Sequence, residues 1–316
     1  MSSVRRATHA GSWYPGSASK LNHDLDRYLD AVPSSKPGSY DSLPVPGARF
    51  IVGPHAGYTY AGPTLAESYK ALDVTNIKRV FILGPSHHVF FRGARLTKFA
   101  HYETPIGAIP VDVDATAQLS DTGLFDKMSA QTDEDEHSFE MHMPFLYKVA
   151  SAQGSIPKLV PILVGSCSAE YERQLASVLA PYFQDESNAF VISTDFCHWG
   201  DRFDYLMYTT KEDCSDARSL SYSAKADPKV PIYKSIEYLD RLGMQKASTG
   251  SYDEFNQYLD KTDNTICGRR PLAILLKTVE LANSDARLNW IGYAQSSKVH
   301  DVLSSSVSYA SGFAVA

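Results

Sequence analysis

Two histidines and one cysteine of this 316-residue sequence have the residue types and the positions of metal ligands. His55 follows the apolar run 49–52 after a Gly-Pro pair, and His87 follows the apolar run 80–83 after a Gly-Pro-Ser tripeptide. Ligands of open α/β sheets bind beyond the carboxyl ends of the strands, and Cys267, just before a helical run, could reach the same crevice. Two imidazoles and a thiolate suit zinc, copper or iron better than magnesium or calcium. We therefore predict that these three residues bind a metal ion; the alternative is that each is a hydrogen-bonded or buried structural residue.

A third apolar run, 190–193, leads into Asp195 and His198, which stand three positions apart. On a tight turn the two side chains could share one face, where His198 would act as a general acid or base and Asp195 would fix its tautomer. Asp195 could instead orient a metal-binding imidazole, or cap the start of a helix. His198 and Asp195 are therefore predicted catalytic residues.

The segment 132–145 combines an acidic run with two histidines. Its HSFEMH pattern is not the HExxH motif, which excludes the helix of zinc proteases. A run of like charges usually lies on a solvated face, and we expect this for residues 133–136. His137, at the end of the run, could still reach the site as a catalytic acid or base, whereas we expect a structural role for His142.

Two arginines follow Cys267 closely, at positions 269 and 270. Arg269 and Arg270 could bind an anionic group such as a carboxylate or a phosphate, because a guanidinium offers a fork of hydrogen-bond donors. They are the predicted substrate-binding or anion-binding residues.

Hydrophobic periodicity and turn residues predict alternating strands and helices. Helices are expected at 19–32, 63–72, 113–122, 140–152, 169–183, 232–242, 251–260 and 269–282. Strands are expected at 49–52, 79–84, 94–98, 106–113, 158–164, 189–194, 288–294 and 306–315. Pro63 is expected in the first turn of its helix, and the polar stretches 33–47 and 209–230 are expected to be flexible loops. The alternation predicts a three-layer α/β architecture in one domain, 1–316, with a mixed central sheet.

Composition excludes several classes of protein. A formal charge of −6 and a pI near 5.9 argue against nucleic-acid binding, which normally needs a basic face. No apolar run approaches the roughly 18 residues of a membrane span, and we find no secretory signal. The four cysteines form no CxxC pair, which favours reduced thiols and a cytoplasmic or nuclear location. Among them, Cys214 lies in a polar stretch and is expected to be exposed.

Long stretches of the sequence resemble the Memo family (mediator of cell motility). The matching stretches are HAGSWYP (9–15), PHAGYTYAG (54–62), FILGPSHH (81–88), QTDEDEHSFEMHMPF (131–145), VISTDFCHWGDRF (191–203), NTICGRRP (264–271), GYAQSS (292–297) and SVSYASG (306–312). They follow one another over nearly the whole chain. The resemblance implies a fold similar to class III extradiol dioxygenases, which hold non-haem iron with two histidines and a glutamate.

The resemblance also implies roles for individual residues. His55 and His87 match the two histidine ligands of those dioxygenases, while His198 and His137 match their acid and base histidines. Cys267 falls where those enzymes have the carboxylate, and this departure from the 2-His-1-carboxylate site weighs against ring-cleaving activity. Membership of the family further implies copper or iron binding, links to reactive oxygen species and cell motility, and a cleft able to hold a phosphotyrosine peptide.

Three hypotheses follow. The first is a metal-dependent redox protein that acts on a small-molecule substrate. The second is a non-catalytic signalling module that binds a phosphopeptide or a signalling protein in a vestigial dioxygenase cleft. The third is a scaffold stabilised by zinc, which chelation would unfold.

Overall fold

The computed structural model describes residues 3–222 and 225–316, and over these residues the chain is built around one mixed β-sheet of nine strands. The sheet contains β2 (Ala48–Gly53), β3 (Arg79–Pro85), β4 (Ala94–Leu96), β7 (Phe125–Lys127), β8 (Lys158–Val164), β9 (Asn188–Ser193), β10 (His198–Trp199), β13 (Asn289–Gln295) and β14 (Ser306–Val315). The strand order is β10-β14-β2-β9-β3-β8-β4-β7, and β13 pairs with β14. The predicted α/β architecture with a mixed central sheet is confirmed.

The middle of the sheet is parallel. Strands β2, β9, β3 and β8 run in one direction, and β14 and β4 flank them in the opposite direction. The central strands are continuous apolar runs because helices cover both faces of the sheet. Within β2, Ile51 joins one hydrophobic cluster while Phe50 and Val52 join the other. The carboxyl ends of β2, β3 and β9 therefore meet at one edge of the sheet, as the positions of His55 and His87 predicted.

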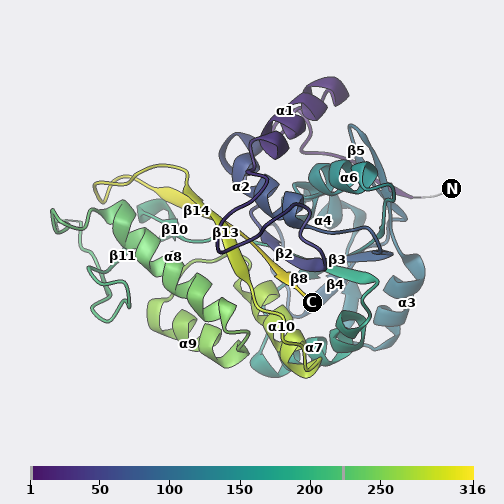
Figure 1. The fold of residues 1–316 in the computed structure, drawn as a ribbon. Helices are drawn as coiled ribbons and strands as arrows, with labels where there is room; N and C mark the ends of the chain where they lie inside the picture. Colours follow the sequence, from purple (N-terminus) through teal and green to yellow (C-terminus); the bar gives the residue numbers. More distant parts are fainter. Residues whose placement is uncertain (1–2, 223–224) are drawn as a thin grey trace.

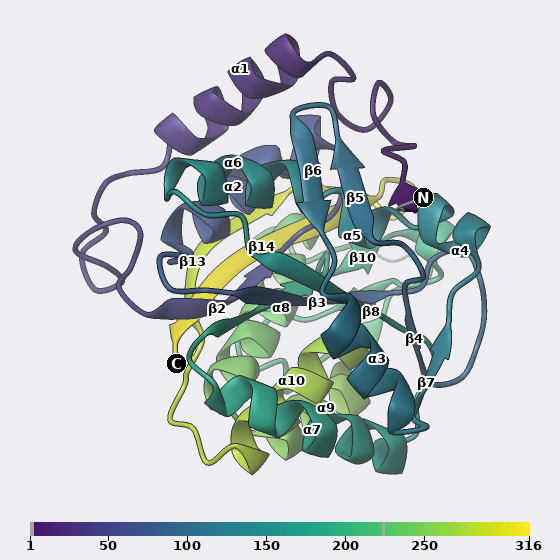
Figure 2. The ribbon, with the colours of Figure 1, turned by 90° about the vertical axis from the view of Figure 1, so that its right-hand side faces the viewer.

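Helices form a layer on each face of the sheet (Figure 2). The longer helices are α1 (Ala18–Asp30), α2 (Tyr58–Ala71), α3 (Val113–Asp121), α6 (Met143–Ala152), α7 (Ala169–Gln184), α8 (Ile232–Ser248), α9 (Tyr252–Thr262) and α10 (Arg269–Leu281). Helices α1, α2 and α6 lie over one face, α7 and α10 lie over the other, and α8 and α9 pack together beyond β13 (Figure 1). None of the helices among the described residues combines the length and the apolar character that a membrane crossing needs.

Local signals explain why several helices match their predicted ranges. The Ser168 side chain accepts a hydrogen bond from Tyr171 N at the start of α7, and Ser251 does the same for Glu254 N in α9. These caps satisfy backbone donors that have no partner inside the helix. Helix α10 begins at Arg269, where the sequence predicted it.

Several helices depart from the prediction, among them α8, which ends at Ser248 rather than at 242, and α4 (Ala130–Asp135), where no helix was expected. Helix α2 begins at Tyr58, so Pro63 lies inside the helix and its expected place in the first turn is wrong. The early start arises because Tyr58 N donates to the Trp13 carbonyl and Gly57 accepts the first helical hydrogen bonds. The expected helix 140–152 is two helices, a short α5 (His137–Glu140) and then α6.

A small second sheet joins the N-terminus to the body of the protein. It contains β1 (Val4–Arg5), β5 (His101–Thr104) and β6 (Gly107–Pro110), in the order β1-β5-β6. Val4 pairs with His101 in the parallel register of β1 and β5. This pairing places Arg5 beside α4 (Ala130–Asp135), which ends in the acidic run.

The acidic run 133–136 is not a solvated surface, and that prediction is wrong. The side chains of Asp133 and Glu136 are each only 1% exposed. Asp133 accepts a hydrogen bond from the buried Arg5, and Glu136 accepts two from His87. Buried carboxylates are tolerated because these donors replace the lost water.

The two predicted loops each contribute a buried side chain. Tyr40 of segment 33–47 packs into the core beside α1 and α2. In segment 209–230, Leu220 is buried next to β12 (Arg218–Ser219), which pairs with β11 (Met207–Tyr208). Residues 223–224 of that segment lie outside the described part of the chain.

Cys214 is fully buried, so the expectation that it is exposed is wrong. It belongs to a hydrophobic cluster that also contains Trp199 and Ile236. The polar residues around Cys214 in the sequence face outward, and only the packing of α8 shows that the thiol faces inward.

Candidate metal centre

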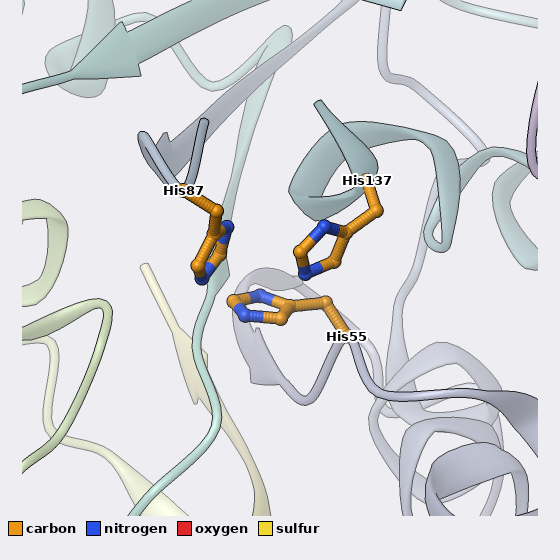
Figure 3. A group of neighbouring side chains, drawn as sticks. All are labelled: His55, His87 and His137. Atoms are coloured by element: carbon orange, nitrogen blue, oxygen red, sulfur yellow. The ribbon is translucent and has the colours of Figure 1, made fainter. Parts of the chain in front are cut away.

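Three imidazoles converge at the carboxyl edge of the sheet. His55 follows β2, His87 follows β3 and His137 is the first residue of α5. One ring nitrogen from each lies within 4.8 Å of one from each of the others, and the three rings point toward one another in Figure 3. Two nitrogens bound to one ion at about 2.0–2.1 Å lie at most about 4.2 Å apart, so small shifts of the rings would let several of these nitrogens share an ion.

The tautomer of His55 is fixed by a hydrogen bond to Ser193, the last residue of β9. The Ser193 hydroxyl donates to the Ser138 carbonyl at 2.6 Å and lies 2.7 Å from His55 Nδ1. Because the single hydroxyl hydrogen is already used, Nδ1 must be the donor, which leaves the lone pair of Nε2 free. Burial, followed by the neighbouring imidazoles, lowers the pKa of His55 well below its usual value, so the ring is neutral.

His87 is oriented by Glu136. The carboxylate accepts from His87 N and from His87 Nδ1, both at 2.8 Å, and also from Ser138 N at 2.9 Å. Burial raises the pKa of Glu136, but the contacts with His87 outweigh it and lower the pKa to about 2. Burial lowers the pKa of His87, but hydrogen bonds with Cys267 and Glu136 outweigh it and raise the pKa to about 10. A carboxylate on Nδ1 leaves Nε2 directed at the centre, the usual arrangement of a metal-binding histidine.

One ring nitrogen of His137 is buried without a hydrogen-bond partner among residues 3–222 and 225–316. Its ring stacks on His87 at 4.3 Å and on Trp13 at 4.4 Å between centroids. Nδ1 is buried, lies 3.8 Å from Glu136 Oε1 and makes no hydrogen bond to any described residue. Burial and the nearby His87 lower the pKa of His137 to about 3, so this ring is also neutral. A buried nitrogen of this kind is costly unless another group pairs with it.

Cys267 adds a sulfur to the same place. Its Sγ lies 3.2 Å from His55 Nε2 and accepts a hydrogen bond from Asp195 N at 3.3 Å. The turn before α10 needs Gly268, because a Cβ there would lie 2.3 Å from the Cβ of Thr194. Gly268 N donates to Thr194 Oγ1 at 2.9 Å, which fixes the turn against the end of β9.

Asp195 supports the backbone that carries His55. Its Oδ1 accepts from His55 N at 2.8 Å, and no hydrogen bond between Asp195 and His198 occurs among the described residues. Burial raises the pKa of Asp195. The alternative that Asp195 caps a helix is wrong, because the next regular element is the strand β10.

His198 lies beside the centre and is held through its Nδ1. Its Nδ1 is 2.9 Å from the Phe196 carbonyl and 3.1 Å from the Thr265 carbonyl, so Nδ1 carries the hydrogen. Nε2 is then the acceptor. His198 is close enough to Asp195 and His55 to affect the pKa of each.

A cavity of about 340 Å³ adjoins Cys267. Arg269, Arg270 and the aromatic residues Phe90 and Phe91 line it. Arg270 is paired with the buried carboxylate of Glu172 at 2.9 Å, whereas Arg269 is exposed to solvent. Of the two predicted anion-binding residues, Arg269 is therefore the one that makes no ion pair within the part of the chain that the structure describes.

Sequence reasoning did not identify Ser193 or Glu136, the residues that orient the two predicted histidine ligands. Ser193 is the only polar residue in the apolar run FVIS, and its position at the end of the strand was the available signal. Glu136 directly precedes His137, but its place in an acidic run suggested a solvated side chain. The pairing of Glu136 with His87, 49 positions away, has no local signature.

Comparison with known proteins gives a consistent result. The family model described as "Memo-like protein" matches residues 5–313. A MEMO1 family protein of Schizosaccharomyces pombe is 41% identical over 315 residues, covering 98% of this chain and 99% of that protein. Protein MEMO1 of Danio rerio is 42% identical and that of Homo sapiens 40% identical, each over 311 residues, 98% of this chain and 96% of the relative.

Proposed function

The chain belongs to the Memo family, and from that premise we propose that it binds a redox-active metal ion, copper or iron, through His55, His87 and Cys267. The observation that supports this most is the matched orientation of the two imidazoles. In each ring Nδ1 is engaged by an oxygen, from Ser193 or from Glu136. This leaves a lone pair on His55 Nε2, which lies 3.2 Å from the Cys267 sulfur. His87 Nε2 becomes a ligand once its hydrogen leaves.

The chemistry of the donors favours these ions. Thiolate is a soft ligand that selects Cu(I), zinc or iron over magnesium and calcium, and imidazole suits the same group. When bound, copper or iron supplies one-electron chemistry, which would link the protein to reactive oxygen species and to the cell motility that the resemblance implies. Cys267 replaces the carboxylate of the 2-His-1-carboxylate site, so extradiol ring cleavage is not part of this proposal. Zinc, in a purely structural role, is the competing ion.

The remaining polar residues would handle protons. His137 Nδ1 has no hydrogen-bond partner in the described part of the chain, and it would take up or release a proton. His198 Nδ1 faces two carbonyl oxygens, so His198 Nε2 would do the same. Asp195 would act by fixing the backbone of His55. Arg269, at the cavity beside Cys267, would attract the anionic end of a small substrate.

Metal content tests the proposal directly. Protein purified without added metal is analysed for its elements and then titrated with Cu(I) and with Fe(II), as wild type and as His55→Ala and Cys267→Ser. His23→Ala, which changes an exposed histidine on α1, is the matched control. We expect one equivalent of copper or iron in wild type and in the control, and loss of tight binding in both site variants. Stoichiometric zinc, or metal content unaffected by His55→Ala, would contradict the proposal.

A phosphopeptide-binding role is a second candidate, favoured by the exposed Arg269 at a cavity with aromatic walls. A phosphotyrosine side chain would place its phosphate on this arginine and its ring against Phe90 or Phe91. The test compares a phosphotyrosine peptide with its unphosphorylated form on wild type, Arg269→Gln and the distant surface control Arg218→Gln. Equal binding of the two peptides, or full binding by Arg269→Gln, would rule the role out.

A further inference from the structure

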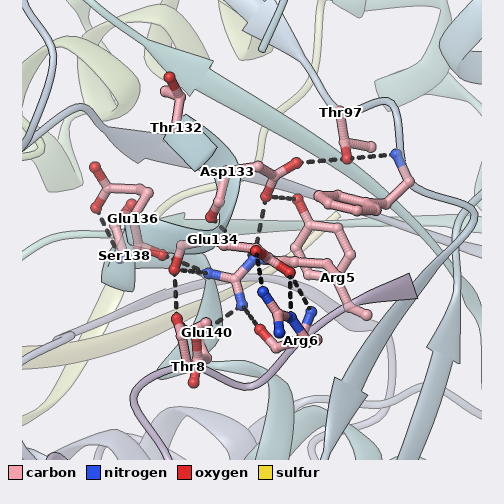
Figure 4. Close-up of polar contacts among 12 residues, drawn as sticks. Arg5, Arg6, Thr8, Thr97, Thr132, Asp133, Glu134, Glu136, Ser138 and Glu140 are labelled. Atoms are coloured by element: carbon pink, nitrogen blue, oxygen red, sulfur yellow. Dashed lines mark hydrogen bonds and ion pairs between the residues drawn. The ribbon is translucent and has the colours of Figure 1, made fainter. Parts of the chain in front are cut away.

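The second residue of β1, Arg5, is a buried cation surrounded by acidic residues far along the chain. Its side chain is 1% exposed, and its Nε donates to Asp133 Oδ1 at 3.1 Å and to the Asp133 carbonyl at 3.0 Å. Nη1 donates to Glu140 Oε2 at 2.7 Å, and Nη2 donates to the Glu136 carbonyl at 2.8 Å. Figure 4 shows the guanidinium between these groups. Nη2 also donates to the Glu134 carbonyl at 3.4 Å, so a single planar group binds four positions of one short segment.

That segment carries two parts of the metal centre. Glu136 holds His87 through two hydrogen bonds of 2.8 Å, and His137 is the next residue. The carbonyl that accepts from Arg5 Nη2 belongs to the peptide unit joining Glu136 to His137. Arg5 thus holds the backbone from which both side chains project.

The two carboxylates fix this segment on either side of that peptide unit. Asp133 also accepts from Tyr102 at 2.6 Å, and Glu140 also accepts from His9 Nδ1 at 2.8 Å. Burial raises the pKa of Glu140, but the hydrogen bond with His9 and the charge of Arg5 outweigh it and lower the pKa to about 2. Both ends of the segment are therefore anchored by ionic contacts away from solvent.

Only an arginine fits this position. The guanidinium directs its five N–H donors outward in a plane, whereas a lysine has three donors at one point. Arg5→Lys keeps the charge beside Asp133 and Glu140 but cannot also reach the Glu136 carbonyl. The substitution therefore separates the geometric role from the electrostatic one.

We propose that Arg5 is a positioning residue for the metal centre, which sets the place of His137 and, through Glu136, the orientation of His87. The proposal rests on the proposed metal-binding function. It gives the N-terminal strand β1 a role in the metal centre. The positions of the predicted ligands, 55, 87 and 267, do not indicate such a role.

Two controls come from the same network. Arg6 has the same charge but is 73% exposed and pairs only with Glu134 among the described residues, and such surface pairs contribute little. Tyr102→Phe removes a hydrogen bond to Asp133 and leaves the bond from Arg5 to the Glu136 carbonyl intact. Tyr102→Phe therefore loosens the network without touching the metal centre.

The experiment uses Co²⁺ as a probe of wild type, Arg5→Lys, Arg6→Lys and Tyr102→Phe in the 316-residue chain. Changes to residues that orient metal ligands typically weaken affinity 10-fold to 100-fold, and we expect that loss, with shifted ligand-field absorption bands at saturation, for Arg5→Lys alone. Tyr102→Phe should lower the midpoint of urea unfolding yet keep the wild-type affinity and spectrum. Wild-type affinity and spectrum in Arg5→Lys would overturn the proposal, as would an equal loss in Tyr102→Phe.

A second measurement does not depend on metal. The imidazole ¹⁵N chemical shifts of His87 and His137 in the metal-free protein should move in Arg5→Lys, while that of the surface residue His23 should not. Absence of Co²⁺ binding by wild type would reject the proposed function, and unmoved shifts would reject the role of Arg5. Should Arg5→Lys fail to fold, Glu140→Gln weakens the same contact from the acceptor side, and unchanged shifts of His87 and His137 in that variant would also overturn the proposal.

Discussion

Metal binding at this site should release a proton from His87. Hydrogen bonds with Cys267 and Glu136 outweigh burial and raise the pKa of His87 to about 10, so the metal-free imidazole is positively charged at neutral pH. The Nδ1 hydrogen is bound to Glu136, so the Nε2 hydrogen must leave before that nitrogen can bind an ion. Below the pKa of His87, affinity should therefore rise about tenfold for each unit of pH.

The expected magnitude is large enough to measure. Between pH 6 and pH 8 one released proton strengthens binding about 100-fold, or about 2.7 kcal/mol. Titration calorimetry with Zn²⁺ at pH 6, 7 and 8, in buffers of different ionisation enthalpy, gives the affinity and counts the protons.

Glu136→Gln tests whether the negative charge of Glu136 helps to raise the pKa of His87. The amide keeps an acceptor for His87 Nδ1 but loses the negative charge, so the pKa of His87 should fall. Proton release should decrease, and the dependence of affinity on pH should flatten between pH 6 and pH 8. Binding by wild type that is independent of pH and releases no proton would refute the assignment of a charged His87.

Three further substitutions test the supports of the site. Ser193→Ala removes the acceptor of His55 Nδ1 and should weaken Zn²⁺ binding 10-fold to 100-fold, with unchanged affinity as the contrary result. Gly84→Ala should lower both stability and Zn²⁺ affinity, because the new Cβ would lie 2.6 Å from a hydroxyl on α5; an unchanged unfolding midpoint would argue against this crowding. Tyr69→Phe removes a 2.9 Å hydrogen bond to the buried His142 and should cost about 1–3 kcal/mol of unfolding free energy in urea, with metal affinity retained.

The part of the site that the sequence predicted depends on local patterns. His55 and His87 each follow a buried run through a Gly-Pro exit, and parallel strands bring such exits to one edge. Cys267 was placed beside them because a helix begins two residues later. Each of these inferences uses only a short window of residues. The convergence of the three side chains follows from the rule that ligands of α/β sheets bind beyond the carboxyl ends of the strands.

The part that was missed depends on contacts between distant segments. The local sequence of the acidic run suggests solvated side chains. Their burial is tolerable because of distant donors, among them Arg5, 128 positions before Asp133, and His87, 49 positions before Glu136. The early start of α2 likewise depends on the Trp13 carbonyl, which is far from Tyr58 in the sequence. No periodicity within the chain encodes such pairings, so a sequence can indicate the ligands without indicating what orients them.

The place of β2 in the sheet has a consequence for protein synthesis. Its two neighbours, β9 and β14, are made long after it, so the strand that leads to His55 has no partner while most of the chain emerges from the ribosome. Pairing over such sequence separations is slow. We therefore expect metal to be loaded after translation, and a nascent chain stopped before β14 should not hold a metal ion that the released protein retains.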